Sequence, residues 1–202
     1  SDILIFPEKY SGWSKIQSII NKYVDSIILI SLEMEKKVNE KRNLLRTKTI
    51  IDGYRDDLFS FKSPPKDSGK INFLSVGALL KVKGHDILIE AVSKLNFENN
   101  LMIIGDGEEY KNLISLVKKF NIYNRFKSVL HVNQNELNNY INNCNIFCMP
   151  SRSDALPAAA LEAMACGRPV VACGVGGLKD IIIDGFNGFL TKPDDPISFA
   201  NG

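Results

Sequence analysis

Two carboxylates stand eight residues apart around a predicted helix start. Asp154 comes before Pro157, and Glu162 comes after it. A proline in the first turn of a helix loses no N–H donor that the helix needs, so Pro157 can open one. The free N–H groups and partial positive charge of such a start attract anions and hydroxyl oxygens. Two acids flanking it could bind sugar or ribose hydroxyls while the amides face phosphate, which predicts a site for a sugar nucleotide.

A glycine-bounded turn, Gly77 to Gly84, joins a predicted strand to a predicted helix and carries Lys83 next to its end. Glycine lets the backbone approach a ligand closely. Lys83 could neutralise a diphosphate through a charge-assisted hydrogen bond worth about 1.5–3 kcal/mol. A plain glycine turn with a solvated lysine explains the same residues, so both interpretations stay open.

Two further glycine segments resemble nucleotide-binding loops only in part. Gly105 and Gly107 follow a strand, but the third glycine of a dinucleotide fingerprint is missing. The loop 174–177 has three glycines and lacks the lysine of a phosphate-binding P-loop. Taken alone, each is better explained as a turn.

The two histidines do not form a catalytic or metal-binding arrangement in the sequence. His85 stands at a helix start, where it could approach phosphate, but we expect it on the surface, and we expect His131 packed within a strand. No Ser–His–Asp order or metal-ligand spacing is present, which argues against a hydrolase and against a metal site. The mixed charges of a helix at 32–44 are typical of a solvated face.

Composition points to a globular protein with a reduced interior. The 202 residues are 45% hydrophobic, and the formal net charge of +2 does not suggest nucleic-acid binding. The apolar runs are too short to span a bilayer, and the first residues do not resemble a secretory signal. We expect structural, reduced cysteines, which fits the cytoplasm. They are Cys144, Cys148, Cys166 and Cys173.

From residue 71 onward, short apolar runs alternate with amphipathic segments. The expected strands are 71–76, 101–105, 127–132, 145–150, 169–173 and 188–190, and the expected helices are 84–95, 108–120, 136–144, 157–166 and 178–183. This alternation predicts the α/β class, with a Rossmann-like, doubly wound parallel sheet covered by helices on both faces. Ligands of such sheets bind at the carboxyl ends of the strands, where the turns described above lie.

The first 50 residues predict too few elements for a complete domain. They contain a helix at about 14–23, a strand at 26–31 and the helix at 32–44, followed by a linker-like stretch rich in prolines and charges. We therefore expect the chain to be a piece of a longer protein.

Three segments resemble one protein family in order and spacing. They are VGALLKVKGHDILIEAVSKL (76–95), LMIIGDGEEYKNL (101–113) and NIFCMPSRSDALPAAALEAMACGRPVVACGVGGLKDIIIDGFNGFL (145–190). Together they resemble the C-terminal, donor-binding half of retaining group 1 glycosyltransferases (family 4), which have the GT-B fold. The resemblance implies a remnant of the N-terminal acceptor domain at 1–53, an interdomain linker at 54–69, and a nucleotide-sugar donor-binding domain at 70–202 that is truncated at its C-terminal helix.

The resemblance also assigns roles to matching positions. Lys83 is similar to the basic residue that binds the donor diphosphate, Asp154 to the acid that touches the transferred sugar, and Glu162 to the acid that binds the nucleotide ribose; these three are the expected catalytic residues. The Gly77 turn would border the diphosphate. The backbone at the helix start would meet sugar hydroxyls and phosphate; it comprises Ala155, Leu156, Pro157 and Ala158.

This chain departs from the family pattern at two of these positions. Asp154 replaces the usual glutamate and is one methylene shorter, and Ala78 replaces an arginine that would be a second cation at the diphosphate. Loss of such a contact costs on the order of 1–3 kcal/mol, unless Arg152 or another side chain compensates.

The resemblance implies a retaining hexosyltransferase that moves a sugar from a nucleotide-diphosphate sugar to a glycan or lipid-linked acceptor, as in polysaccharide biosynthesis. It implies no metal and no cofactor besides the nucleotide sugar, no nucleic-acid partner, and a place in the cytoplasm or at the inner face of the membrane, through peripheral association of the N-terminal domain. We expect this chain alone to be inactive in transfer. A catalytically degenerate nucleotide-sugar-binding module is the main alternative, and a sugar-nucleotide epimerase is the third.

Overall fold

The computed structural model describes residues 26–42, 47–65 and 69–202. The helix expected at about 14–23 lies outside these ranges. The elements, in chain order, are β1 (Ile27–Leu29), α3 (Leu32–Arg42), β2 (Thr47–Thr49), β3 (Ile71–Val76), η1 (Lys81–Lys83), α4 (His85–Ser93), β4 (Asn99–Ile104), α5 (Tyr110–Lys119), η2 (Tyr123–Arg125), β5 (Phe126–Val129), α6 (Gln134–Asn142), β6 (Ile146–Met149), α7 (Ala158–Ala165), β7 (Val170–Cys173), α8 (Leu178–Ile181), β8 (Gly188–Thr191) and α9 (Pro196–Asn201).

A six-stranded parallel sheet forms the centre of the larger unit. Its strand order is β5-β4-β3-β6-β7-β8, and every neighbouring pair is parallel. The apolar run 71–76 forms the central strand β3, in which Phe73 pairs with Leu101 of β4 on one side and Ile146 of β6 on the other. The predicted α/β class and doubly wound parallel sheet are thus confirmed.

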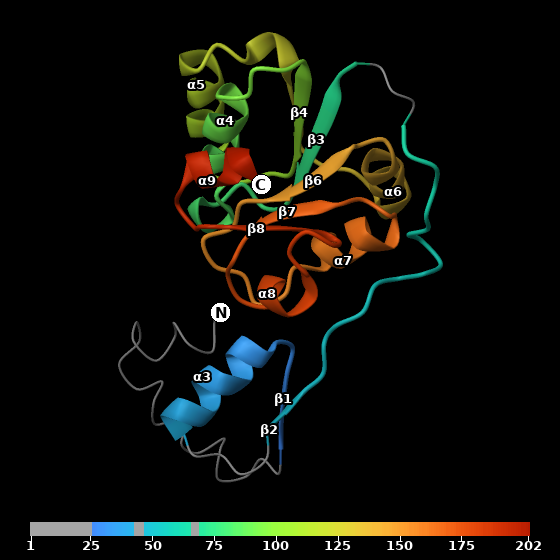
Figure 1. The fold of residues 1–202 in the computed structure, drawn as a ribbon, viewed down its shortest axis with the longest axis vertical. Helices are drawn as coiled ribbons and strands as arrows, with labels where there is room; N and C mark the ends of the chain where they lie inside the picture. Colours follow the sequence, from blue (N-terminus) through green and yellow to red (C-terminus); the bar gives the residue numbers. More distant parts are fainter. Residues whose placement is uncertain (1–25, 43–46, 66–68) are drawn as a thin grey trace.

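Helices cover both faces of this sheet, as Figure 1 shows. Helices α4, α5 and α9 pack on one face, over a core that includes Leu88, Ile103 and Phe199. Helices α6 and α7 pack on the other, over a core that includes Phe147 and Ile141. None of the helices in the described ranges combines the length and the apolar character needed to cross a bilayer.

The four cysteines are buried free thiols within these two cores. Burial raises the pKa of all four, to about 12 for Cys144 and about 11 for Cys173. They pack as small hydrophobic side chains, as the sequence predicts.

The order of the strands fixes where a ligand site can form. From β3 the chain winds outward to β4 and β5, returns to β6 on the other side of β3, and winds outward again to β7 and β8. The direction of winding therefore reverses between β3 and β6. A crevice at the carboxyl ends of two such strands is the usual ligand site of open α/β sheets.

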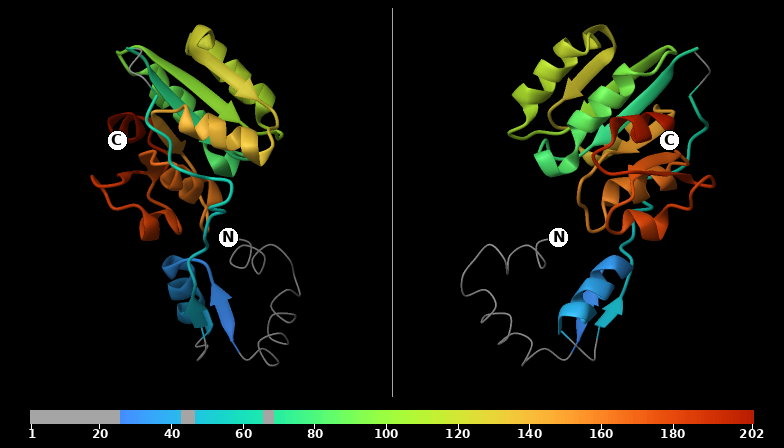
Figure 2. Two further views of the ribbon diagram at one scale, coloured as in Figure 1. Left: turned by 90° about the vertical axis from the view of Figure 1, so that its right-hand side faces the viewer. Right: turned by 60° about the vertical axis from the view of Figure 1, so that its left-hand side comes forward.

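A smaller unit, formed by β1, α3 and β2, lies beyond one end of the large sheet (Figures 1 and 2). Its two short strands pair in parallel, with Ile27 opposite Thr47. The strand β2 was not predicted, because its residues resemble the start of the linker. An extended segment, residues 50–65, then runs from this unit along the side of the larger unit (Figure 2).

Part of that connecting segment is anchored on α6 and α7. The side chain of Phe59 is 2% exposed and belongs to the core beneath these helices. The amide of Asn142 donates to the carbonyl of Ser60 at 3.2 Å, and the guanidinium of Arg168 donates to the carbonyl of Lys62. A segment with the composition of a linker thus follows a fixed path across the surface.

Candidate functional site

The turns that follow β3 and β6 are in direct contact. Gly84 has a left-handed backbone (φ 69°), and a Cβ atom there would lie 1.9 Å from the carbonyl oxygen of Pro150. The N–H of Arg152 donates to the carbonyl of Val82 at 2.8 Å. Only glycine at position 84 permits this approach, which brings the lysine turn and the first acidic residue together.

Lys83 and Asp154 form an ion pair at this contact. The Nζ of Lys83 lies 2.5 Å from Oδ2 of Asp154, and the hydroxyl of Ser151 donates to the same oxygen at 3.3 Å. The lysine side chain is 27% exposed and that of Asp154 only 10%, so the pair is shielded from most of the solvent. The cation and the acid that the sequence predicts for diphosphate and sugar are therefore neighbours.

The glycine loop 174–177 supports the backbone that carries Asp154. Gly176 has a φ of 51°, and a Cβ atom there would lie 1.5 Å from the carbonyl oxygen of Asp154. The N–H of Gly177 donates to the carbonyl of Ala155 at 2.6 Å. Taken alone, this loop is better explained as a turn, yet in the structure it is also one wall of the site.

A polar cavity of about 250 Å³ opens between this loop, the β6 turn and the start of α3. Its lining residues are Glu33, Met34, Lys37, Arg152, Ser153, Asp154, Ala155, Gly174, Val175, Gly176 and Lys179. The prediction that the charged helix 32–44 is a solvated face agrees with Lys37, which is exposed, but not with Glu33, whose side chain is only 24% exposed. The charge pattern gave no sign of this, because it does not show what lies opposite the helix.

Contacts across the cavity link α3 to α8. Glu33 forms ion pairs with Lys37 and, at 2.9 Å, with Lys179. The N–H of Leu32 donates to the Asp180 carboxylate at 2.8 Å. Hydrogen bonds from Lys37 and Lys179 lower the pKa of Glu33. We call these contacts of Leu32 and Glu33 with Lys179 and Asp180 the α3–α8 clasp.

The other predicted donor-binding residues lie at the start of α7. Leu156 and Pro157 are buried, and Pro157 precedes the first helical residue, Ala158, which is exposed. Side chains do not cap this helix start. Glu162 lies one turn further on and is half-buried; within the described residues its carboxylate has no hydrogen-bond partner, and desolvation raises its pKa. Neither Glu162 nor Ala158 lines the polar cavity.

Gly77 directly follows β3, and its N–H donates to the carbonyl of Ile104 at 3.0 Å. The methyl group of Ala78 is exposed and offers no donor. The prediction that His85 lies on the surface is wrong, because the residue is only 3% exposed. The prediction that His131 is packed within a strand is also wrong, because β5 ends at Val129 and His131 is exposed. The sequence did not reveal that the turn between β3 and α4 folds over the His85 ring.

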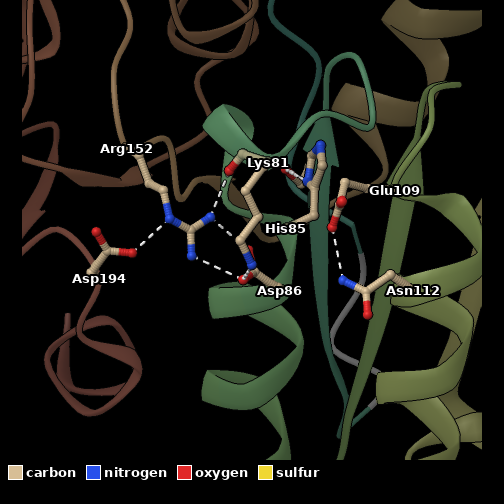
Figure 3. A network of polar contacts seen from close by, with 8 residues as sticks. Lys81, His85, Asp86, Glu109, Asn112, Arg152 and Asp194 are labelled. Carbon is tan, nitrogen blue, oxygen red and sulfur yellow. Dashed lines mark hydrogen bonds and ion pairs between the residues drawn. The ribbon is translucent and has the colours of Figure 1, made fainter.

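Arg152, which could replace the missing cation at Ala78, is engaged by other groups in this structure. Figure 3 shows its guanidinium between two aspartates: it donates to Asp86 at 2.8 and 2.9 Å, to Asp194 at 2.6 Å, and to the carbonyl of Lys81 at 2.6 Å. Although burial favours the neutral acid, hydrogen bonds from Arg152 and Lys81 lower the pKa of Asp86 to about 2. These acceptors hold the guanidinium in place.

A larger cavity, of about 330 Å³, lies at the opposite end of the strands. It is lined by residues such as Asn72, Asn100 and Phe126, at the amino ends of β3, β4 and β5. It contains none of the acids or lysines discussed above, and it lies away from the edge of a parallel sheet where ligands bind. The smaller polar cavity is therefore the candidate site.

Residues 56–202, well over half of the chain, match the protein family described as glycosyl transferases group 1. The chain belongs to this family. An uncharacterized glycosyltransferase of Methanocaldococcus jannaschii is 34% identical over 175 residues, covering 85% of this chain and 46% of the relative. The chain spans about half the length of the curated relatives it matches.

Solved structures of other proteins have the same fold. Sucrose-phosphate synthase from Thermosynechococcus elongatus is 26% identical with a TM-score of 0.83, covering 93% of this chain and 50% of that one. HepE from Anabaena, whose crystal structure is a complex with UDP-glucose, is 24% identical with a TM-score of 0.83, covering 96% and 58%. The GT-B assignment of the fold is confirmed.

Proposed function

We propose that this chain forms the donor-binding part of a retaining glycosyltransferase, which moves a sugar from a nucleoside-diphosphate sugar to a glycan or lipid-linked acceptor. The observation that carries the proposal is the Lys83–Asp154 ion pair, because it stands at the point where the winding of the sheet reverses and beside a polar cavity. HepE, of the same fold, binds UDP-glucose, so a fold of this kind can hold such a donor.

In this proposal the ion pair is exchanged when the donor binds. The diphosphate would replace Asp154 as the partner of Lys83, and the released carboxylate would accept hydrogen bonds from sugar hydroxyls. A lysine held at the bridging oxygen stabilises the negative charge that grows there as the sugar–phosphate bond breaks. Because Lys83 is already positioned by the contact of the two turns, little reorganisation is needed at that moment.

Glu162 would bind the ribose of the nucleotide. Its carboxylate is half-buried and has no partner among the described residues, so hydroxyl donors would satisfy it. Retention of configuration and the transfer of a hexose rest on the family resemblance. The buried free thiols favour the cytoplasm, and we place the acceptor site in sequence beyond this chain.

Calorimetric titration of the chain with UDP, GDP and ADP tests donor binding. One nucleotide should bind, and Glu162→Ala should abolish or strongly weaken that binding. Absence of binding of all three nucleotides would count against the proposal.

Lys83→Met should lower affinity for the same nucleotide at least tenfold, since a charge-assisted bond to phosphate contributes about 1.5–3 kcal/mol. Lys81→Met is the matched control, because Lys81 is 60% exposed and pairs with Asp86 instead. The affinity of Lys81→Met for the nucleotide should stay within about twofold of that of the unsubstituted chain. Equal losses of affinity in the two variants would contradict a specific role for Lys83.

A catalytically degenerate binding module is the second candidate. It is favoured by Ala78, whose side chain carries no positive charge, and by Arg152, whose guanidinium donates to Asp86 and Asp194. Ala78→Arg separates the two candidates in the same titration. A large gain in nucleotide affinity would indicate a decayed site, and no gain would indicate that another group already makes the contact.

A further inference from the structure

The imidazole of His85 has one nitrogen without a partner in the interior of the protein. The residue is 3% exposed, and its Nδ1 lies 3.3 Å from the hydroxyl of Ser75 on β3. Nε2 is buried and reaches no described residue in normal hydrogen-bond geometry, although the backbone of Gly77 and Ala78 lies close enough to the ring to raise its pKa. Buried polar atoms are nearly always paired, so an unpaired one calls for an explanation.

The unpaired nitrogen faces the turn that carries Gly77. A Cβ atom built on Gly77 would have Nε2 of His85 and Cδ of Lys83 as its nearest neighbours beyond the adjacent residues, each at 4.0 Å. The missing side chain thus leaves room at the turn, bordered by the imidazole and by the lysine that pairs with Asp154. Figure 3 shows the second ring nitrogen of His85 directed toward the loop, away from the one in the hydrogen bond.

The charge state of the ring suits a hydrogen-bond donor. Burial lowers the pKa of His85 to about 4, and the positive charge of Lys83 acts in the same direction. Interactions with the backbone of Gly77 and Ala78 and the negative charge of Asp86 act in the opposite direction. The ring is therefore neutral at pH 7. If the Ser75 hydroxyl donates to Nδ1, the single proton of the ring is on Nε2, where it faces the turn.

We propose that Nε2 of His85 donates a hydrogen bond to a phosphate oxygen of the donor diphosphate, beside Lys83. The inference rests on the proposed function and deepens it. It supplies a second phosphate contact at a turn where Ala78 has no donor and where Arg152 is held by two aspartates. A bound anion would also favour the protonated form of the ring, so the pKa of His85 should rise when a diphosphate is present.

Two substitutions separate a contact with phosphate from a contact with ribose. His85→Phe keeps a flat ring and removes both nitrogens, and it should weaken binding of both the nucleoside diphosphate and inorganic pyrophosphate about tenfold or more. Glu162→Ala should weaken binding of the nucleotide and leave that of pyrophosphate unchanged. Calorimetry with the nucleotide, and its displacement by pyrophosphate, give the two affinities.

A second variant tests whether His85 only braces the turn. Ala78→Arg should raise pyrophosphate affinity more in His85→Phe than in the unsubstituted chain, because the arginine replaces the lost phosphate contact; if His85 only braces the turn, the gain should not be larger in His85→Phe. Should His85→Phe fail to fold, NMR titration of the unsubstituted chain decides: the pKa of His85 should rise by about one unit or more when pyrophosphate saturates the site.

Unchanged pyrophosphate affinity in a folded His85→Phe, or an unchanged pKa of His85 at saturation, would overturn the inference and leave the proposed function standing. Failure of the unsubstituted chain to bind any of UDP, GDP and ADP would overturn both.

Discussion

Single residues in this site are placed for ligand contact at some cost to stability. Glu162 is the clearest case, because its carboxylate is partly desolvated without a described partner, and this raises its pKa. Asp154, by contrast, is stabilised by Lys83 and Ser151. Substitution of the paired Asp154 and of the unpaired Glu162 should therefore change the stability of the chain in opposite directions.

Glu162→Gln should stabilise the chain at pH 7 and weaken nucleotide binding. An acid with a raised pKa in the folded state binds its proton more tightly there than in the unfolded chain, so its contribution falls as pH rises above the ordinary value of 4.5. Thermal unfolding should show a melting temperature about 1–3 °C higher at pH 7, and no difference near pH 4. A lower melting temperature at pH 7 would refute this.

Elements position the site mainly through backbone contacts between turns. Gly84 lets the β3 turn reach Pro150, and Gly176 lets the glycine loop reach the carbonyl of Asp154. Both positions have a left-handed backbone, and at both a side chain would collide with backbone atoms. The acids and the lysine are thus held by the close approach of loops that lie far apart in the sequence.

Gly176→Ala should destabilise the chain by about 3 kcal/mol or more and also displace Asp154, since the added methyl group has no room. Gly185→Ala is the matched control: Gly185 also has a left-handed backbone (φ 76°), but nothing lies within 4 Å of its added Cβ atom. Gly185→Ala should therefore lower the free energy of unfolding by only about 1–2 kcal/mol, the cost of placing alanine in a left-handed backbone. Urea unfolding of both variants measures the difference, and equal losses would show that crowding at Asp154 is unimportant.

Sequence patterns predicted the elements well and the site in part. The run 71–76 and β3 coincide, because a strand buried on both faces is continuously apolar. Lys83 and Asp154 were identified separately, but their bond depends on how two turns approach each other, which a linear pattern does not encode. For the same reason, the cavity-lining Glu33 and Lys37 resembled an ordinary solvated helix face, and the burial of His85 was missed.

At the scale of the whole molecule, the α3–α8 clasp and one anchored segment connect the small unit to the large one among the residues that the structure describes. The α3–α8 clasp bridges the cavity, and residues 58–62 follow the surface of α6 and α7. Glu33 and Lys179 of the clasp line the polar cavity. Opening of the molecule at this point would therefore change the access to the site.

Removing the clasp should loosen the two units with little effect on global stability. Lys179→Met with Asp180→Ala should broaden the distance distribution between spin labels at the exposed positions Lys36 and Lys111, while urea unfolding shifts by less than about 1 kcal/mol for the exposed ion pair. Lys192→Met, on an exposed lysine away from the clasp, should leave the distribution unchanged. An unaltered distribution in the double variant would show that the anchored segment alone fixes the arrangement.

The buried thiols make that distance measurement practical. Thiol-specific reagents attack the thiolate at an accessible sulfur, and here burial both raises the pKa of each native cysteine and shields it. Introduced surface cysteines should react with such reagents at neutral pH, while the four native cysteines remain unmodified. Spectroscopic probes can therefore be attached to the natural background, without a cysteine-free variant whose core would have to be repacked.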